Sequence, residues 1–422
     1  MWKLIIFDLD NTLIHSDHLE EFRGLENVDN TSSAYKKKLL SAIEDELEVL
    51  IDEATLLAIE KQYPEAEFAV FTTSPRFYAE TILDHVYPNM EWATVIGYED
   101  VKHTKPDPEG IAIAMDDAGL DEDDLYAIAM VGDSEKDIKA AYRAGVWAIL
   151  FRGGWPYRFK PAHWAAQNSM ADIEVKTAKE LVEALAEPDD HLWALEAHLA
   201  TESDTADFQL ERIHKARRFC NLHGSEGNCV VRVCGRIFTK YEALDARRTW
   251  HSLTTLIDEL KKETEFPEVV IAAVRVAIRK AFFEDHSTLF FKNPELAQVL
   301  ITCIPKKPGR PARMEGLVEQ LEGASAKRPL ISQVKLEFDA KSFSFSTGVK
   351  SHHGEHLNAE ERFKNIRDHL KLVDPEKING RYVIILDDVL TTGATTYFAD
   401  KLCREAGAKG VISIALAQAI SP

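Results

Sequence analysis

Paired carboxylates and a run of hydroxyls lie close together near the carboxyl end of the chain. Asp387 and Asp388 follow an apolar, β-branched run at residues 383–386, which is typical of a buried strand. A small-residue turn then precedes a stretch of helical composition, where backbone N–H groups and the helix dipole favour an anion. The pattern predicts a site for a ribose 5′-phosphate, although acid pairs also precede ordinary turns. The residues of this turn are Thr391, Thr392, Gly393, Ala394 and Thr395.

A second acid pair, Asp8 and Asp10, follows an apolar run at residues 4–7. Residues two apart in a strand share a face, so the two carboxylates should leave the sheet side by side. They would repel each other unless a cation lay between them. Mg²⁺ is typically held by one or two carboxylates together with water and a substrate phosphate. The pair therefore predicts a magnesium site.

Other polar side chains are predicted at the same kind of position. Thr72 follows an apolar run, as does the pair Asp133 and Asp137, and Lys105 lies in a Lys-Pro-Asp-Pro loop. Open α/β sheets bind ligands at the carboxyl ends of their strands, so we expect these side chains to meet Asp8 there. Taken singly, each has a simpler interpretation, because a lone lysine is often a solvated charge and a lone threonine a helix cap.

The overall composition narrows the class of protein. A chain of 422 residues predicts two or three domains, and a hydrophobic content of 45% is typical of a globular protein. The formal charge of −20 argues against non-specific binding to nucleic acid or anionic membranes, although a local basic groove would escape this argument. No apolar run reaches membrane-spanning length, the first residues meet charge too early for a signal peptide, and five scattered cysteines indicate no disulfide framework. We therefore predict a cytoplasmic protein.

In chain order, the four stretches of the amino-terminal half resemble the four motifs of the haloacid-dehalogenase superfamily, whose members are mostly Mg²⁺-dependent phosphatases. The resemblance implies that Asp8 is the nucleophile that forms an aspartyl-phosphate. Asp10 would act first as the acid and then as the base. Thr72 would hold the phosphoryl oxygens, and Lys105 would balance charge between Asp8 and phosphate. An aspartate at the second position favours phosphatase over dehalogenase chemistry.

The same resemblance implies how the metal and the substrate are held. Asp8, Asp133 and the backbone carbonyl of Asp10 would form the Mg²⁺ site, with Asp137 in support. Within an insertion at about residues 16–64, residues 35–60 have the apolar spacing of one or two amphipathic helices, and similar insertions in this superfamily form small caps that choose the substrate. We place three side chains near the cleft: His15, His18 and Arg23. Each of them could instead be simply solvated.

A basic loop at residues 305–313 stands out in this acidic chain. Four cations follow an apolar run there, and they include Lys306, Lys307 and Arg310. At the end of a strand, arginine and lysine predict a polyanion such as pyrophosphate, which arginine grips bidentately and lysine as a point charge. A solvated basic loop has the same composition and remains the alternative.

Residues 383–395 resemble the phosphoribosyl-pyrophosphate (PRPP) signature of the type I phosphoribosyltransferases. A Leu-x-x-x-x-Arg-x-x-Asn segment at residues 357–365 is similar to one in the ComF-like members of that group, so the resemblance covers residues 210–422. It implies that PRPP binds with Mg²⁺ and places its ribose hydroxyls on Asp387 and Asp388. The 5′-phosphate would lie on the threonine-rich turn and the pyrophosphate near the basic loop.

A group of cysteines and one histidine could hold zinc. The inventory suits the metal, but the two-cysteine knuckle spacing is missing, and reduced cysteines in a core are the simpler interpretation. ComF-like proteins begin with a zinc-binding module, yet the pattern here departs from theirs. The four candidate ligands are Cys220, His223, Cys229 and Cys234.

Both resemblances imply the α/β class. We expect two doubly wound, parallel-sheet (Rossmann-like) domains, the first haloacid-dehalogenase-like with a small helical cap and the second like the type I phosphoribosyltransferases. The predicted boundaries are a hydrolase domain at 1–187 with its cap insertion at about 16–64, an acidic linker at 188–208, and a phosphoribosyltransferase-like domain at 209–422.

The leading hypothesis is a bifunctional enzyme of nucleotide or nucleoside metabolism that acts on a small phosphorylated molecule and on PRPP. Phosphoribosyl transfer yields a nucleoside 5′-monophosphate, and a phosphatase could then remove that phosphate. One alternative is a phosphatase joined to a domain that only senses PRPP or a nucleotide. Another is a phosphatase that processes nucleic-acid ends, against which the net charge argues. A homodimer is compatible with this hypothesis, whereas membrane attachment is not.

Overall fold

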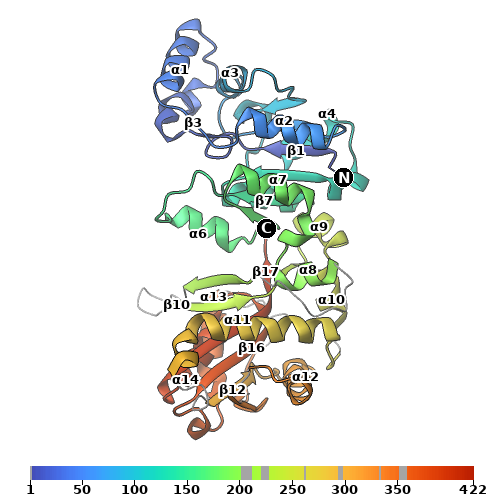
Figure 1. Ribbon diagram of the computed structural model, residues 1–422, viewed down its shortest axis with the longest axis vertical. Coiled ribbons are helices and arrows are strands. Elements are labelled where there is room, and N and C mark those ends of the chain that lie inside the picture. Colours follow the sequence, from blue (N-terminus) through green and yellow to red (C-terminus); the bar gives the residue numbers. More distant parts are fainter. Residues whose placement is uncertain are drawn as a thin grey trace. The chain divides into compact units, whose positions relative to one another are not determined.

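The structure is a computed structural model that describes residues 2–200, 212–219, 228–260, 263–292, 298–331, 334–350 and 359–422. The chain forms two compact units, shown in Figure 1. The first contains Met1–Leu192, Phe238–His251 and Ser421–Pro422, and the second contains Trp193–Ile237 and Ser252–Ile420. Within the described ranges, every helix is too short or too polar to cross a membrane.

The first unit is built on a six-stranded parallel sheet with the order β5-β4-β1-β6-β7-β8. Its central strands are apolar and buried on both faces, as expected for a sheet covered by helices on each side. The central position of β1 brings the residues after it to the middle of the carboxyl edge. The strands are β1 (Leu4–Phe7), β4 (Glu67–Phe71), β5 (Thr94–Ile96), β6 (Ile128–Gly132), β7 (Trp147–Phe151) and β8 (Ile173–Val175).

Helices connect these strands and share one hydrophobic core with the sheet. The stretch predicted as a helical insertion contains a two-stranded ribbon, short 3-10 turns and two helices, and Tyr35, Leu39 and Ile43 form the buried face of the first of these helices. The inserted elements are β2 (Ile14–His15), η1 (Asp17–Phe22), α1 (Ser33–Asp45), β3 (Glu48–Val49) and α2 (Glu53–Gln62). The connecting helices are α3 (Arg76–Val86), α4 (Glu109–Asp117), α5 (Glu135–Ala144), α6 (Pro161–Asn168) and α7 (Ala178–Ala186).

The second unit contains a seven-stranded sheet with the order β13-β12-β16-β17-β10-β9, and β11 (Arg236–Phe238) pairs with β17. The pairs from β13 to β10 are parallel, and β9 is antiparallel to β10 at the edge. The strands are β9 (His214–Phe219), β10 (Asn228–Val233), β12 (Gln298–Cys303), β13 (Lys335–Phe338), β16 (Tyr382–Leu390) and β17 (Gly410–Ile420).

Five main helices accompany this second sheet. Residues of α11 and α12 share a hydrophobic core with β12, β16 and β17, whereas α13 and α14 pack together, with α14 also against the sheet. A separate two-stranded ribbon pairs β14 (Phe343–Phe345) with β15 (Leu370–Leu372). The helices are α10 (Ser252–Glu259), α11 (Glu268–Lys292), α12 (Arg313–Lys327), α13 (Ala359–His369) and α14 (Ala394–Glu405).

The predicted α/β class is confirmed with the parallel sheet of the first unit, whereas a phosphoribosyltransferase-like second domain stays a prediction; the two units divide the chain differently from the predicted boundaries. The stretch expected to be a linker contains η5 (Pro188–His191) and α8 (Ala194–Ala200), and its last residues lie outside the described part. Residues 238–251, which we predicted in the second domain, belong to the first unit. They contain α9 (Asp245–Trp250), which packs against α5 and buries Arg247 beside Asp172.

Candidate functional site

A buried ion-pair cluster lies at the carboxyl edge of the first sheet. Asp8 follows β1 directly and is 7% exposed. The Lys105 ammonium donates to Asp8 Oδ1 at 2.5 Å, to Asp137 Oδ1 at 2.6 Å and to the carbonyl of Phe71 at 2.9 Å. The structure therefore brings together a carboxylate, a lysine and a second carboxylate that the sequence predicted at three separate strand ends.

Three carboxylates form the acidic part of this cluster. Asp8, Asp133 and Asp137 each offer an oxygen, and these oxygens all lie within 4.8 Å of one another. Ser134 caps α5 and donates to Asp137 Oδ2 from its backbone at 3.0 Å and from its hydroxyl at 2.6 Å. Because Lys105 and Ser134 already engage both oxygens of Asp137, this side chain fits a supporting role, and Asp8 and Asp133 are the better candidate ligands.

The charges of these groups show why a cation suits the cluster. Burial raises the pKa of Asp8 to about 7, against the opposing charge of Lys105, and burial also raises the pKa of Asp133 well above its ordinary value. Burial alone would lower the pKa of Lys105. The nearby carboxylates of Asp137 and Asp8 have a larger combined effect, and the pKa is raised overall. Two buried acids thus share one lysine beside the half-buried Asp133, and carboxylate oxygens at this spacing are the ligands that Mg²⁺ prefers.

The carboxylate of Asp10 lies in a separate group of donors. Its Oδ2 accepts from the Ser74 hydroxyl at 2.6 Å and from the Thr72 hydroxyl at 3.4 Å. Its Oδ1 accepts from the Tyr78 hydroxyl at 2.9 Å and lies 3.3 Å from Arg23 Nη1. The sequence predicted Asp10 and Thr72 and placed Arg23 near the cleft, but it missed the other two.

Different signals explain the two omissions. Ser74 is part of the hydroxyl-rich run that begins at Thr72, so its type and spacing could have been used. Tyr78 is a fully buried aromatic on the first turn of α3, and in the sequence it cannot be told from a core residue. Burial raises the pKa of its hydroxyl well above the ordinary value, so it acts here as a hydrogen-bond donor.

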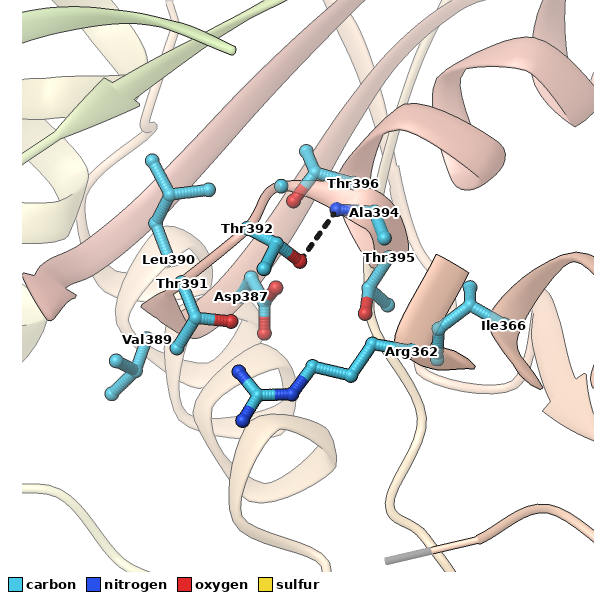
Figure 2. A pocket seen from close by; sticks show the side chains of 11 residues that line it. Arg362, Ile366, Asp387, Val389, Leu390, Thr391, Thr392, Ala394, Thr395 and Thr396 are labelled. Carbon is cyan, nitrogen blue, oxygen red and sulfur yellow. Dashed lines mark hydrogen bonds between the residues drawn. The ribbon is translucent and has the colours of Figure 1, made fainter. Parts of the chain in front are cut away.

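Asp387, the first acid of the pair in the second unit, lines a pocket near the end of β16, which Figure 2 shows. Asp387 and residues 391–396 line the pocket, which is open to solvent. Gly393 has a φ of 80° and ends the turn at which α14 begins, a conformation that glycine adopts without strain. Arg362 reaches from α13 into the space between Asp387, Thr391 and Thr395.

The residues of the predicted basic loop do not line this pocket, but two of its cations lie near the acid pair. Lys307 lies close enough to Asp387 and Asp388 to feel their charge, and burial lowers its pKa to about 8. Its buried Nζ has no hydrogen-bond partner among the described residues. Lys306 and Arg310 are exposed, whereas Arg313, which was not among the predicted site residues, lies 3.2 Å from Asp388 Oδ2.

The predicted zinc ligands receive no support. Cys220 and His223 lie outside the described residues. Cys229 and Cys234 are buried and form no disulfide with another described cysteine, and burial raises the pKa of Cys234 to about 12. In the part of the chain that the structure describes, neither belongs to a cluster of metal-ligating side chains. Cys229 Sγ instead lies 4.0 Å from the carbonyl oxygen of Gly393.

Comparison with known proteins finds relatives of the first unit. The family model of haloacid dehalogenase-like hydrolases matches residues 16–151. N-acetylmuramic acid 6-phosphate phosphatase of Pseudomonas aeruginosa is 29% identical over 119 residues, which are 28% of this chain and 49% of that protein. Validoxylamine A 7′-phosphate phosphatase of Streptomyces hygroscopicus is 28% identical over 184 residues, which are 35% of this chain and 85% of that protein.

The other matches are shorter or more distant. Phosphoglycolate phosphatase 1 of Pseudomonas aeruginosa is 32% identical over 80 residues, which cover 19% of this chain and 28% of that protein. The crystal structure of CbbY from Rhodobacter sphaeroides in complex with phosphate is 18% identical with a TM-score of 0.33, and covers 43% of this chain and 96% of that one. The chain thus spans half or less of the length of the first two curated relatives. The family match and the named phosphatases support a haloacid dehalogenase-like hydrolase domain of the phosphatase type in the amino-terminal unit.

Proposed function

We propose that the first unit is a Mg²⁺-dependent phosphomonoesterase that acts on a small phosphorylated molecule through an aspartyl-phosphate at Asp8. The observation that carries this proposal is the buried contact of Asp8 with Lys105 beside Asp133 and Asp137. The matched relatives are named as phosphatases of small phosphorylated compounds, and this supports the same substrate class here.

The residues divide the reaction into two displacements. Asp8 attacks phosphorus while Asp10 donates a proton to the leaving oxygen, so that the ester bond breaks as the acyl-phosphate bond forms. Water then attacks phosphorus, Asp10 takes its proton, and the carboxylate of Asp8 is restored as phosphate leaves. Lys105 holds Asp8 in place throughout, and Thr72, whose hydroxyl donates weakly to Asp10, would donate to a phosphoryl oxygen of the substrate.

The metal would be held by Asp8 and Asp133, with Asp137 fixing the cluster. When bound, Mg²⁺ neutralises charge on the phosphoryl oxygens. The donor set fits it, because hard carboxylate oxygens converge there and the single lysine leaves the cluster short of positive charge.

The test is phosphate release from a panel of small phosphomonoesters by the purified protein with Mg²⁺. Asp8→Asn should abolish release because the amide cannot form the acyl-phosphate, and chelation of Mg²⁺ should do the same. Asp117→Asn is a matched control, since Asp117 is exposed at the end of α4. Turnover that survives in Asp8→Asn would refute the assignment of the nucleophile.

We further propose that the pocket of the second unit binds PRPP. The observation that favours it is a threonine-rich turn at the start of α14 beside an acid pair, with the buried Lys307 Nζ and Thr396 Oγ1 lacking partners among the described residues. A phosphate on the turn and a pyrophosphate near Lys307 would satisfy both groups. Asp387 and Asp388 would accept from the ribose hydroxyls.

Two activities are consistent with this second site. In a phosphoribosyltransferase, an acceptor displaces pyrophosphate at ribose C1, and the product would be a nucleoside 5′-monophosphate that the first unit could dephosphorylate. In a sensor, PRPP binds without turnover. Calorimetry with PRPP and Mg²⁺, followed by pyrophosphate release across a panel of acceptor bases, distinguishes them, and Asp387→Ala should lower binding in both cases. Undiminished PRPP binding by that variant would refute the site.

A further inference from the structure

Arg23 links the inserted segment to the reaction site. It follows η1, and its guanidinium Nη1 lies 3.3 Å from Asp10 Oδ1 and 3.1 Å from the Ser16 hydroxyl. The side chain is 21% exposed. A cation from the insertion therefore contacts the carboxylate that must handle the leaving group in the proposed reaction.

In this arrangement Asp10 has four donors on two oxygens. Tyr78 and Arg23 share Oδ1, and Ser74 and Thr72 share Oδ2. An acid cannot present a proton to a leaving oxygen while donors surround both of its own oxygens. In the proposed reaction Thr72 turns to a phosphoryl oxygen, but both oxygens of Asp10 still have donors, and a second donor must leave before the proton is transferred.

Arg23 is the donor best placed to leave. Apart from the contact of Thr72 at 3.4 Å, its contact at 3.3 Å is the longest, against 2.6 Å for Ser74 and 2.9 Å for Tyr78. Tyr78 is fully buried and Thr72 nearly so, whereas Arg23 is partly exposed and lies in the insertion, apart from the sheet. A guanidinium that gives up one carboxylate needs another anion to replace it.

We propose that Arg23 is a specificity-determining residue that exchanges Asp10 for a second anionic group of the substrate. Resting on the proposed phosphatase function, this names the substrate class as a phosphomonoester that carries a further carboxylate or phosphate. Such a substrate draws Arg23 away and frees Asp10, and the planar guanidinium binds either anion bidentately. A neutral ester leaves Arg23 on Asp10 and is hydrolysed slowly.

The experiment compares esters matched in length that differ in the second charge. The pairs are phosphoglycolate with 2-hydroxyethyl phosphate, and 3-phosphoglycerate with glycerol 3-phosphate. Wild-type protein with Mg²⁺ should favour the anionic member of at least one pair. Arg23→Ala should lower kcat/KM for that member by roughly 10- to 100-fold, the effect of one charge-assisted hydrogen bond, and should raise kcat for the neutral member because Asp10 is released. Arg23→Lys should restore part of the preference.

Lys37→Ala is the matched control, since Lys37 is an exposed cation of α1 in the same insertion. This variant should leave kcat/KM unchanged for both members of a pair. An equal loss of kcat/KM for both members of a pair in Arg23→Ala would overturn the inference, because Arg23 would then only hold the insertion in place. A wild type without charge preference would overturn it as well. If wild type releases no more phosphate than Asp8→Asn from any ester, the phosphatase proposal fails, and this inference fails with it.

Discussion

Lys105 forms ion pairs with two buried carboxylates, Asp8 and Asp137. Its side chain is 3% exposed, and those of Asp8 and Asp137 are 9% and 2% exposed. Removing one partner of a buried ion pair typically costs about 3–5 kcal/mol, because the remaining charge stays buried without compensation. Lys105→Met should therefore lower the free energy of unfolding by about that amount in urea titrations.

The same variant tests the metal site without any assay of activity. Mg²⁺ should recover part of the lost stability of Lys105→Met, because a cation bound to Asp8 and Asp133 supplies the missing charge. Lys139→Met on the solvent side of α5 loses only an exposed pair with Glu135, and should cost less than about 1 kcal/mol. Equal losses in the two variants would contradict this account of the cluster.

Lys307 gives the second pocket a pH dependence. Burial lowers its pKa from 10.5 in the unfolded chain to about 8. Below pH 8 the ammonium is charged in both states and its burial costs stability, so this cost disappears as pH rises from 8 to 10.5. A bound anion favours the charged form, so affinity for pyrophosphate or PRPP should be flat below pH 7 and fall by about tenfold per pH unit above pH 8.

Calorimetric titration of pyrophosphate between pH 7 and 9.5 measures this slope. Lys307→Arg should flatten it, because a guanidinium stays charged over that range. Lys306→Arg is the control, since Lys306 is exposed on the same loop and its replacement should leave the slope unchanged. A slope that persists in Lys307→Arg would assign the titration to another group.

The strand ends show what could be predicted from the sequence and what could not. A short apolar run followed by acids predicted that Asp8 leaves the sheet directly after β1, because burial on both faces leaves a strong local pattern. β16 nevertheless continues to Leu390, since residues beyond the predicted end still pair with β17. Tyr78 and Arg313 were missed because the orientation of a helix brings each side chain to its site. Their distance along the sequence from the acids does not indicate this orientation.

The junction of β6 and α5 depends on a glycine. A Cβ on Gly132 would lie 2.3 Å from Cγ of Asp137, closer than such atoms approach. Gly132→Ala should push Asp137 away from Lys105, cost about 1–3 kcal/mol of stability and weaken the response of stability to Mg²⁺. Gly323→Ala is the opposite control, because its site in α12 is open and alanine favours a helix by about 0.5–1 kcal/mol. An unchanged response to Mg²⁺ in Gly132→Ala would argue against a metal at the cluster.

The assignment of residues 238–251 to the first unit could not be read from local patterns. Their composition fits any surface helix, and the contacts that place them involve residues far away in the chain. Arg247 is buried against the carboxylate of Asp172 and stacks over the ring of Trp250, with its guanidinium carbon 3.4 Å from the ring centroid. Trp250 in turn donates to the carbonyl of Gly145 at 2.9 Å. Such pairings depend on the assembled fold.

This arrangement predicts that the first unit is incomplete as a fragment of residues 1–192. Without α9, Asp172 loses its buried partner and the side of α5 that α9 covers becomes exposed. Addition of a synthetic peptide of residues 238–251 should raise the melting temperature of the fragment by several degrees. The rise should grow with peptide concentration, as it does for any ligand that binds the folded state. A peptide carrying Arg247→Ala should give little gain, because it cannot compensate Asp172. Scanning calorimetry of the fragment with each peptide measures this, and equal melting in all three samples would show that residues 238–251 add nothing to the unit.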